Sequence, residues 1–196
     1  MAVLPACASR KMTDQLASVQ TAQEAGLAKP GTWQPGRGGL ENVLPPIASM
    51  QDLAAAKDGI GISTAIVPGF VAQDIEAEAD VEFDSTGAAA VCFRVLQEDS
   101  GLITSMYTVA VFSKGVHLWR LQAGRWSRLH SYFLELPVLQ THRVYVKVRR
   151  DLVTVAINGK TLFQARDSVL VTPGSVGVRA SEGQCRFHSF RVKSLK

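Results

Sequence analysis

The clearest pattern in the chain is a strict alternation of charged and apolar residues between Asp74 and Asp84. The apolar positions are Ile75, Ala77, Ala79, Val81 and Phe83. In an extended strand these side chains share one face, whereas a helix would scatter the intervening carboxylates around its circumference. The alternation therefore predicts a long antiparallel strand with one buried and one solvated face.

Shorter segments with the same period follow along the rest of the chain. They predict strands over residues 88–96, 105–113, 116–121, 126–136, 142–149, 152–157, 161–166, 175–180 and 184–192, and one more within 59–71. Lys114-Gly115, Gln122–Arg125 and Asn158-Gly159 are expected to be hairpin turns. A helix is expected only over Ser49–Lys57, where Ser49 and Asp52 form a capping box. This arrangement predicts an all-β fold, either a β-sandwich of two antiparallel sheets or a β-barrel.

The first 30 of the 196 residues differ from the remainder, being rich in Ala, Gln, Ser and Thr. We expect residues 1–30 to be a flexible tail or the remnant of an export leader, and residues 31–196 to be one domain. Val3–Cys7 resembles the end of a bacterial lipoprotein signal, in which the cysteine is lipidated. Six residues precede Cys7, without the usual charged start and apolar stretch of about 7–15 residues. The resemblance implies a secreted or cell-envelope location.

Composition and charge narrow the classes of partner. The sequence has no run of about 18 apolar residues, so we expect no transmembrane segment. Residues 1–84 carry 5 Lys+Arg and 11 Asp+Glu (net −6), whereas residues 85–196 carry 16 and 6 (net +10). The basic residues are spaced singly, which favours pairing within one domain over a nucleic-acid partner. Three cysteines exclude a disulfide scaffold. Cys92 and Cys185 are expected to be free and buried, a disulfide being the alternative.

Several short motifs occur in the order found in a known fold. They are Gly31–Trp33, Gly39-Leu40, the alternating strand, Gly87–Arg94, Arg143–Arg149, Asp151, Val153–Ile157, Asn158-Gly159, Asp167, Gly174–Val178 and Phe187–Val192. Together they resemble the concanavalin A-like jelly roll over about residues 31–196. Similar members are laminin-G-like domains, the C-terminal sandwich of family-32 glycosidases and the 3-keto-disaccharide hydrolases, of whose pattern Arg94 is retained. The fold hosts lectins, hydrolases and adhesion modules, so it does not by itself define a function.

The acidic face of the alternating strand allows two interpretations. Glu78-Ala-Asp80-Val-Glu82 resembles the signature of family-16 glucanases, which implies Glu78 as nucleophile, Glu82 as acid/base and Asp80 as the residue that tunes them. Retaining hydrolysis needs carboxyl groups about 5–5.5 Å apart, whereas positions i and i+4 of a strand lie ~13 Å apart. We therefore favour an acidic surface that pairs with basic strands, and we assign no catalytic residue. The expected basic partners are Arg143, Lys147, Arg149, Arg186, His188, Arg191 and Lys193.

The hairpin register indicates which side chains share the other solvated face. A Lys114-Gly115 loop places Phe112 opposite His117, and the following turn places Leu121 opposite Trp126. The expected ligand-binding patch is Arg94, Thr108, His117, Trp119, Trp126 and Arg128. Indole rings cover the C–H face of a sugar while Arg and His bond its hydroxyls. Trp33 is expected in the core.

The leading interpretation is a non-catalytic, lectin-like carbohydrate-binding module with a glycan as its partner. The alternatives are a glycan hydrolase of the glucanase or 3-keto-disaccharide type, and a structural interaction domain that binds no sugar. The four histidines lack metal-ligand spacing, so no metal site or cofactor is expected. Some members of this fold bind calcium, for which Asp99, Asp151 and Asp167 are available, but they form no evident ligand set.

Overall fold

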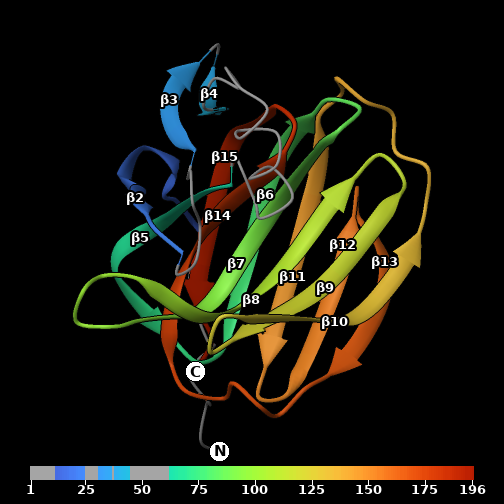
Figure 1. Ribbon diagram of the computed structural model, residues 1–196. Helices are drawn as coiled ribbons and strands as arrows, with labels where there is room; N and C mark the ends of the chain where they lie inside the picture. Colours follow the sequence, from blue (N-terminus) through green and yellow to red (C-terminus); the bar gives the residue numbers. More distant parts are fainter. Residues whose placement is uncertain (1–11, 25–30, 37, 45–61) are drawn as a thin grey trace, which may run out of the picture.

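A computed structural model describes residues 12–24, 31–36, 38–44 and 62–196. Within these residues the chain forms two antiparallel sheets packed face to face, called here sheet A and sheet B. In Figure 1 the strands β7–β10 of sheet B lie in front of the strands β11–β13 of sheet A. The predicted all-β, two-sheet class is confirmed. The helix expected over Ser49–Lys57 and the residue Cys7 fall outside the described residues.

Sheet A holds the alternating strand at its centre. Its strands are β1 (Thr13–Asp14), β3 (Thr32–Gly36), β4 (Gly39–Val43), β6 (Ile75–Phe83), β11 (His142–Arg149), β12 (Leu152–Ile157), β13 (Lys160–Arg166) and β15 (Cys185–Ser194). The order across the sheet is β13-β12-β11-β6-β15-β4-β3, and β1 also pairs with β15. Strand β6 therefore lies between β11 and β15, the two basic strands.

Sheet B carries the aromatic hairpins. Its strands are β2 (Gln20–Ala22), β5 (Ser63–Ala72), β7 (Gly87–Gln97), β8 (Ile103–Phe112), β9 (Gly115–Gln122), β10 (Arg125–Phe133) and β14 (Gly174–Glu182). The order is β10-β9-β8-β7-β14-β5-β2. A short 3-10 helix, η1 (Leu16–Ser18), connects β1 to β2.

The core lies between the sheets and follows the alternation. All five apolar side chains of β6, from Ile75 to Phe83, are buried, as predicted. They pack with the inward residues of sheet B, among them Val91, Val109 and Val178. Trp33 is half-buried against this core, with its ring 5.7 Å from that of Phe187. Period-two patterning therefore determines which face of each sheet is buried.

Part of the expected tail belongs to the sandwich. β1 pairs with β15 through Thr13 and Val192, and β2 pairs with β5 through Thr21 and Ala65. Leu16 and Val19 pack against the main core. The segment 12–24 thus adds a strand to each sheet, although its sequence has no strong strand pattern.

Two hairpins have the turns that the sequence indicates. Asn158-Gly159 and Ala123-Gly124 both have positive φ at both central positions, which a type I′ turn requires. The third differs: Phe112 lies opposite Gly115, so the loop is Ser113-Lys114 rather than Lys114-Gly115. His117 therefore faces Ala110 instead of Phe112. The predicted register was wrong by two positions, which leaves every side chain on its predicted face.

Arg94 breaks the alternation of β7. It has a φ of +50°, and the pairing with β8 shifts between Phe93 and Leu96. The bulge directs Val95 to a second apolar cluster instead of the main core. The Arg94 side chain donates to the carbonyls of Gln73 (3.0 Å) and Leu170 (2.7 Å), and to that of Arg150. The prediction that Arg94 lies on the outer face was wrong.

Candidate functional site

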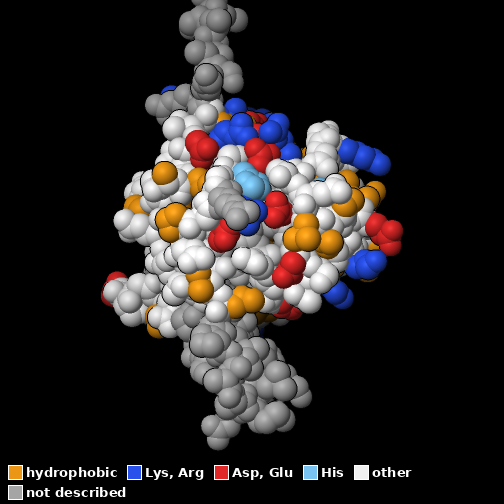
Figure 2. Space-filling model, turned by 90° about the horizontal axis from the view of Figure 1, so that it is seen from above, with side chains coloured by type: hydrophobic (Ala, Val, Ile, Leu, Met, Phe, Trp, Pro, Cys, Tyr) orange, Lys and Arg blue, Asp and Glu red, His pale blue; other side chains and the backbone are white. Residues whose placement is uncertain are grey.

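The acidic row of β6 is paired with the basic strands on both sides. Its first member, Glu76, lies 3.0 Å from the Lys147 ammonium of β11 and 2.7 Å from that of Lys193 on β15. Burial alone would raise the pKa of Glu76, but the bonds and charges of the two lysines lower it below its ordinary value. Seen from above in Figure 2, Lys and Arg side chains likewise lie beside Asp and Glu side chains.

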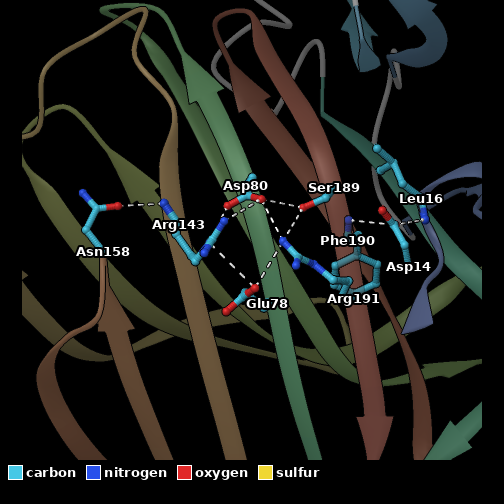
Figure 3. A network of polar contacts seen from close by, with 9 residues as sticks. All are labelled: Asp14, Leu16, Glu78, Asp80, Arg143, Asn158, Ser189, Phe190 and Arg191. Atoms are coloured by element: carbon cyan, nitrogen blue, oxygen red, sulfur yellow. Dashed lines mark hydrogen bonds and ion pairs between the residues drawn. The ribbon is translucent and has the colours of Figure 1, made fainter. Parts of the chain in front are cut away.

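The middle of the row is a denser network (Figure 3). Asp80 accepts hydrogen bonds from Arg143 at 2.8 Å, from Arg191 at 2.9 Å and from the Ser189 hydroxyl at 2.8 Å. Arg191 also lies 3.2 Å from Glu78. Burial opposes ionisation of Asp80, yet these donors outweigh it and lower its pKa.

Glu82 ends the row. It lies 3.0 Å from Arg186, whose guanidinium also bonds Glu41 of β4, and 3.6 Å from His188. Glu78, Asp80 and Glu82 are therefore all held by cations on the outer face of sheet A. The predicted pairing of the acidic row with two basic strands is confirmed for six of the seven expected partners, whereas no ion pair of Arg149 is found within the described residues.

The other solvated face is hollowed. A cavity of about 760 Å³ opens on the outer face of sheet B. It is lined by Ile62, Ser85, Thr86, Gly87, Ala88, Thr108, Ala110, Phe112, Ser113, Lys114, His117, Trp119, Trp126, Arg179, Ser181 and Glu182. Four of the six residues of the predicted patch are brought together here, namely Thr108, His117, Trp119 and Trp126. Arg128 lies beside the cavity, with its guanidinium carbon 5.6 Å from the centre of the Trp119 ring.

Aromatic rings form a connected row along this cavity. The ring of His117 lies 4.7 Å from that of Phe112 and 5.9 Å from that of Trp119, and Trp119 lies 6.5 Å from Trp126, all in edge-to-face contact. Burial, together with the charge of Arg128, lowers the pKa of His117, which favours the neutral form of its ring. Its buried Nε2 atom has no hydrogen-bond partner among the described residues.

Arg179 of β14 is a lining residue that the sequence analysis missed. Its guanidinium carbon lies 5.0 Å from the centre of the Trp126 ring on β10. The two strands are four positions apart in the sheet, which is about 19 Å at the usual strand spacing. Side chains meet across that distance only if the outer face of sheet B is concave. The sequence did indicate that Arg179 lies on the outer face, because it stands between Val178 and Ala180, whose side chains point into the core.

Glu24 holds Arg179 from the N-terminal segment. Arg179 donates from Nε to Glu24 Oε1 at 2.6 Å and from Nη2 to Oε2 at 3.3 Å. The Thr64 hydroxyl donates to the same Oε1 at 2.5 Å. Glu24 also bridges to Ile103 at the start of β8, so the segment crosses the sheet face. No local pattern marks Glu24, which lies in the expected tail.

Asp84 fixes one rim of the cavity. Its Oδ1 accepts from the backbone N–H groups of Thr86 (2.9 Å) and Gly87 (2.6 Å), and its Oδ2 from that of Gln184 (2.9 Å). Burial alone would raise the pKa of Asp84, but these bonds lower it. The start of β7 and the turn between β14 and β15 are therefore tied to one carboxylate.

Both described cysteines are free and buried, as expected. Cys92 lies in a second apolar cluster with Val95, Met106 and Leu121, whereas Cys185 lies in the core between the sheets. Burial raises the pKa of both thiols, that of Cys185 to about 12.

The carboxylates considered for calcium are engaged elsewhere. Asp151 bonds Arg166 at 2.8 Å, and Asp167 bonds Arg120 and the Tyr107 hydroxyl, each at 2.5 Å. Asp99 lies in the turn between β7 and β8. Within residues 12–24, 31–36, 38–44 and 62–196, no group of three or more His, Cys, Asp or Glu side chains is arranged to hold a metal ion. The same part of the chain has no helix long and apolar enough to span a membrane.

Comparison with known proteins finds likeness in structure but not in sequence. No protein-family model matches the chain, and no curated protein matches it. The carbohydrate binding module CBM66 from Bacillus subtilis is similar with a TM-score of 0.70 at 18% identity, over 90% of this chain and 96% of that one. A Bacillus licheniformis β-glucanase is similar with a TM-score of 0.67 at 9% identity, over 95% of this chain and 100% of that one.

A third similar structure is the carbohydrate recognition domain of Emp46p in its metal-free form. Its TM-score is 0.62 at 10% identity, over 92% of this chain and 90% of that one. At such identities the likeness concerns the fold and not the function. It agrees with the resemblance carried by the sequence motifs, and the chain accordingly has the concanavalin A-like jelly-roll fold.

Proposed function

We propose that this chain is a non-catalytic carbohydrate-binding module whose site is the cavity on the outer face of sheet B. The observation that carries the proposal is the row of aromatic rings lining that cavity, His117, Trp119 and Trp126. A sugar offers apolar C–H faces to aromatic rings and hydroxyl groups to polar side chains. The cavity supplies both kinds of surface together.

The polar groups suit uncharged hydroxyls. Burial and the charge of Arg128 lower the pKa of His117, which favours the neutral ring, so His117 brings no net charge to the lining. Trp126 is 38% exposed, and Arg179 packs on its ring. Two of the similar structures have names that describe carbohydrate binding or recognition, which supports the proposal at the level of fold.

The acidic row takes no part in this proposal. Glu78, Asp80 and Glu82 lie on sheet A, and none of them lines the cavity of sheet B. Each has a cation within 4 Å. A secreted or cell-envelope location belongs to the same proposal, since Val3–Cys7 resembles a lipoprotein signal and glycans are abundant there.

The test is a glycan-array screen of the purified chain, followed by calorimetric titration of the best neutral hit. We expect Trp119→Ala and Trp126→Ala each to weaken binding at least ~10-fold, since a buried aromatic contact contributes about 1.5–3 kcal/mol. The matched control is Tyr145→Ala, which removes a half-buried aromatic side chain on sheet A. Binding that survives both tryptophan substitutions, or no binding to any glycan, would overturn the proposal.

A further inference from the structure

The ion pair between Glu24 and Arg179 is unusual for a cavity wall because it is almost fully buried. The Glu24 side chain is 2% exposed and that of Arg179 is 9% exposed. A buried ion pair loses its hydration, and apolar residues of similar volume are often equally stable in its place. Stabilisation of the fold alone therefore explains the ion pair poorly. Because Arg179 lines the cavity, the alternative is a role of the pair in that site.

The geometry leaves part of the guanidinium free for a ligand. An arginine has five N–H donors in a fixed plane. Glu24 accepts from Nε and Nη2, and no hydrogen bond from Nη1 of Arg179 is found within the described part of the chain. The ring of Trp126 lies over the guanidinium carbon and limits its movement. Arg179 is thus held in one orientation, beside the aromatic row.

The charge of the wall is already compensated. Glu24 neutralises Arg179, and the Lys114 ammonium lies 3.2 Å from Glu135. The remaining charged side chain among the described lining residues is Glu182, which is exposed at the rim. Arg128 is exposed outside the lining, where solvent screens it. Among the described lining residues a negatively charged sugar would therefore meet the carboxylate of Glu182, and behind Arg179 it would be repelled by that of Glu24, which does not itself line the cavity.

We propose, on the basis of the function proposed above, that Arg179 is the main polar contact for the sugar. Glu24 is its positioning residue and sets the preference of the site for neutral over acidic sugars. Neutral hydroxyl oxygens accept from the free guanidinium donors without adding charge. A carboxylate would gain charge-assisted hydrogen bonds from an unpaired guanidinium, but Glu24 already neutralises Arg179 at 2.6 Å and repels a second anion.

The experiment compares sugars that differ only by oxidation at C6. Oligomers of glucose, galactose and mannose are titrated beside oligomers of glucuronic, galacturonic and mannuronic acid. The wild-type chain is expected to bind at least one neutral oligomer ~10-fold or more tighter than its acidic counterpart. Glu24→Gln should shift this ratio towards the acid by roughly 10- to 50-fold, the effect of removing one like charge about 7 Å away at an effective dielectric constant of about 20.

Two further variants separate charge from structure. Glu182→Gln removes an exposed carboxylate at the rim and should shift the ratio by less than ~3-fold, because solvent screens that charge. Arg179→Lys keeps the charge but not the planar fork, and should weaken binding of the neutral oligomer at least ~10-fold. A purely structural role for Glu24 would lower binding of both oligomers equally.

The outcomes separate this inference from the proposed function. Tighter binding of the acidic oligomer by the wild-type chain, or an unchanged ratio in folded Glu24→Gln, overturns the inference and leaves the carbohydrate-binding function standing. Failure of the wild-type chain to bind any oligomer overturns both. The wild-type ratio needs no substitution. A preference of the wild-type chain for the acidic oligomer therefore overturns the inference even where Glu24→Gln does not fold.

Discussion

Replacing Arg94 with methionine is expected to destabilise the fold and to leave sugar binding intact. The guanidinium joins three separate loops, because it donates to the carbonyls of Gln73, Leu170 and Arg150. It also lies 3.6 Å from the Asp74 carboxylate, and the Arg94 residue is 1% exposed. Methionine fills the volume of the aliphatic stem but donates no hydrogen bond.

The magnitude follows from those contacts. A buried acceptor left without a donor costs about 1–3 kcal/mol. Only the bond to Leu170 is fully buried, and water can reach the other two carbonyls. Burial lowers the pKa of Arg94, which shows that its charge is held at a cost that the substitution removes. The net loss is therefore about 3–5 kcal/mol, less than three full penalties.

Urea unfolding followed by tryptophan fluorescence measures this loss. With a slope of about 2 kcal/mol/M, the midpoint should fall by roughly 1.5–2.5 M. The control is Arg166→Met, which breaks an exposed pair with Asp151 and should cost less than about 1 kcal/mol. A loss below about 1 kcal/mol for Arg94→Met would refute the structural role. So would a fully stable variant that no longer binds glycan, since that result would return Arg94 to the ligand face.

Three further predictions concern acid stability, thiols and one glycine. The pKa of Asp80 is lowered in the fold, so its ionised carboxylate contributes fully to the stability of the fold at neutral pH, and this contribution is lost as the pH falls below about 4 through the folded pKa. Asp80→Asn should therefore flatten the fall of the urea midpoint between about pH 5 and pH 2. A profile equal to that of the wild type would contradict this. In a Cys7→Ser chain, burial should keep Cys92 and Cys185 unmodified by a thiol reagent at pH 8 until denaturant is added, so rapid labelling of the native chain would show that the core opens. Gly115→Ala would place a Cβ atom 2.2 Å from the backbone oxygen of Tyr132 in β10, so the substitution should lower the midpoint of thermal unfolding by several degrees. A midpoint equal to that of the wild type would mean that β10 moves freely.

The face on which each strand residue lies was predictable. Alternation of apolar and polar residues determines the face of a side chain more strongly than it determines the pairing register between strands. The loop after β8 is one position earlier than expected, and cross-strand partners shift by two. His117 and Trp119 nevertheless lie on the predicted face, since a shift of two residues in a strand returns a side chain to the same side. Pattern alone was therefore sufficient to place four of the six patch residues in one cavity.

Arg94 was misplaced because a bulge leaves little trace in a sequence. The expected face of β7 continued from Val91 and Phe93 to Val95, and the bulge at Arg94 ends that continuation. Its φ of +50° is one that glycine adopts most readily, yet the residue is arginine. Three carbonyl acceptors hold it there, and they come from loops distant in the chain.

The Glu24–Arg179 pair was missed for a related reason, since its two members are 155 positions apart. Arg179 could have been placed on the outer face by parity, but nothing near Glu24 in the sequence indicates a buried carboxylate. Burial of that carboxylate depends on the N-terminal segment pairing with β5 and bridging to β8. Contacts of this kind follow from topology, which local periodicity does not encode.

The acidic row shows why a motif must be weighed against its neighbours. Along β6, like charges at i and i+2 are separated by about 6.7 Å, whereas residues on adjacent strands are about 4.8 Å apart. Glu76 has a lysine opposite it on each side, and Asp80 is bonded from both flanking strands. Attraction across the strands acts over the shorter distance and outweighs repulsion along the row. A Glu-x-Asp-x-Glu spacing is therefore what alternation produces on a central strand between two basic ones, and the pairing in sheet A gives each of the three carboxylates a cationic partner.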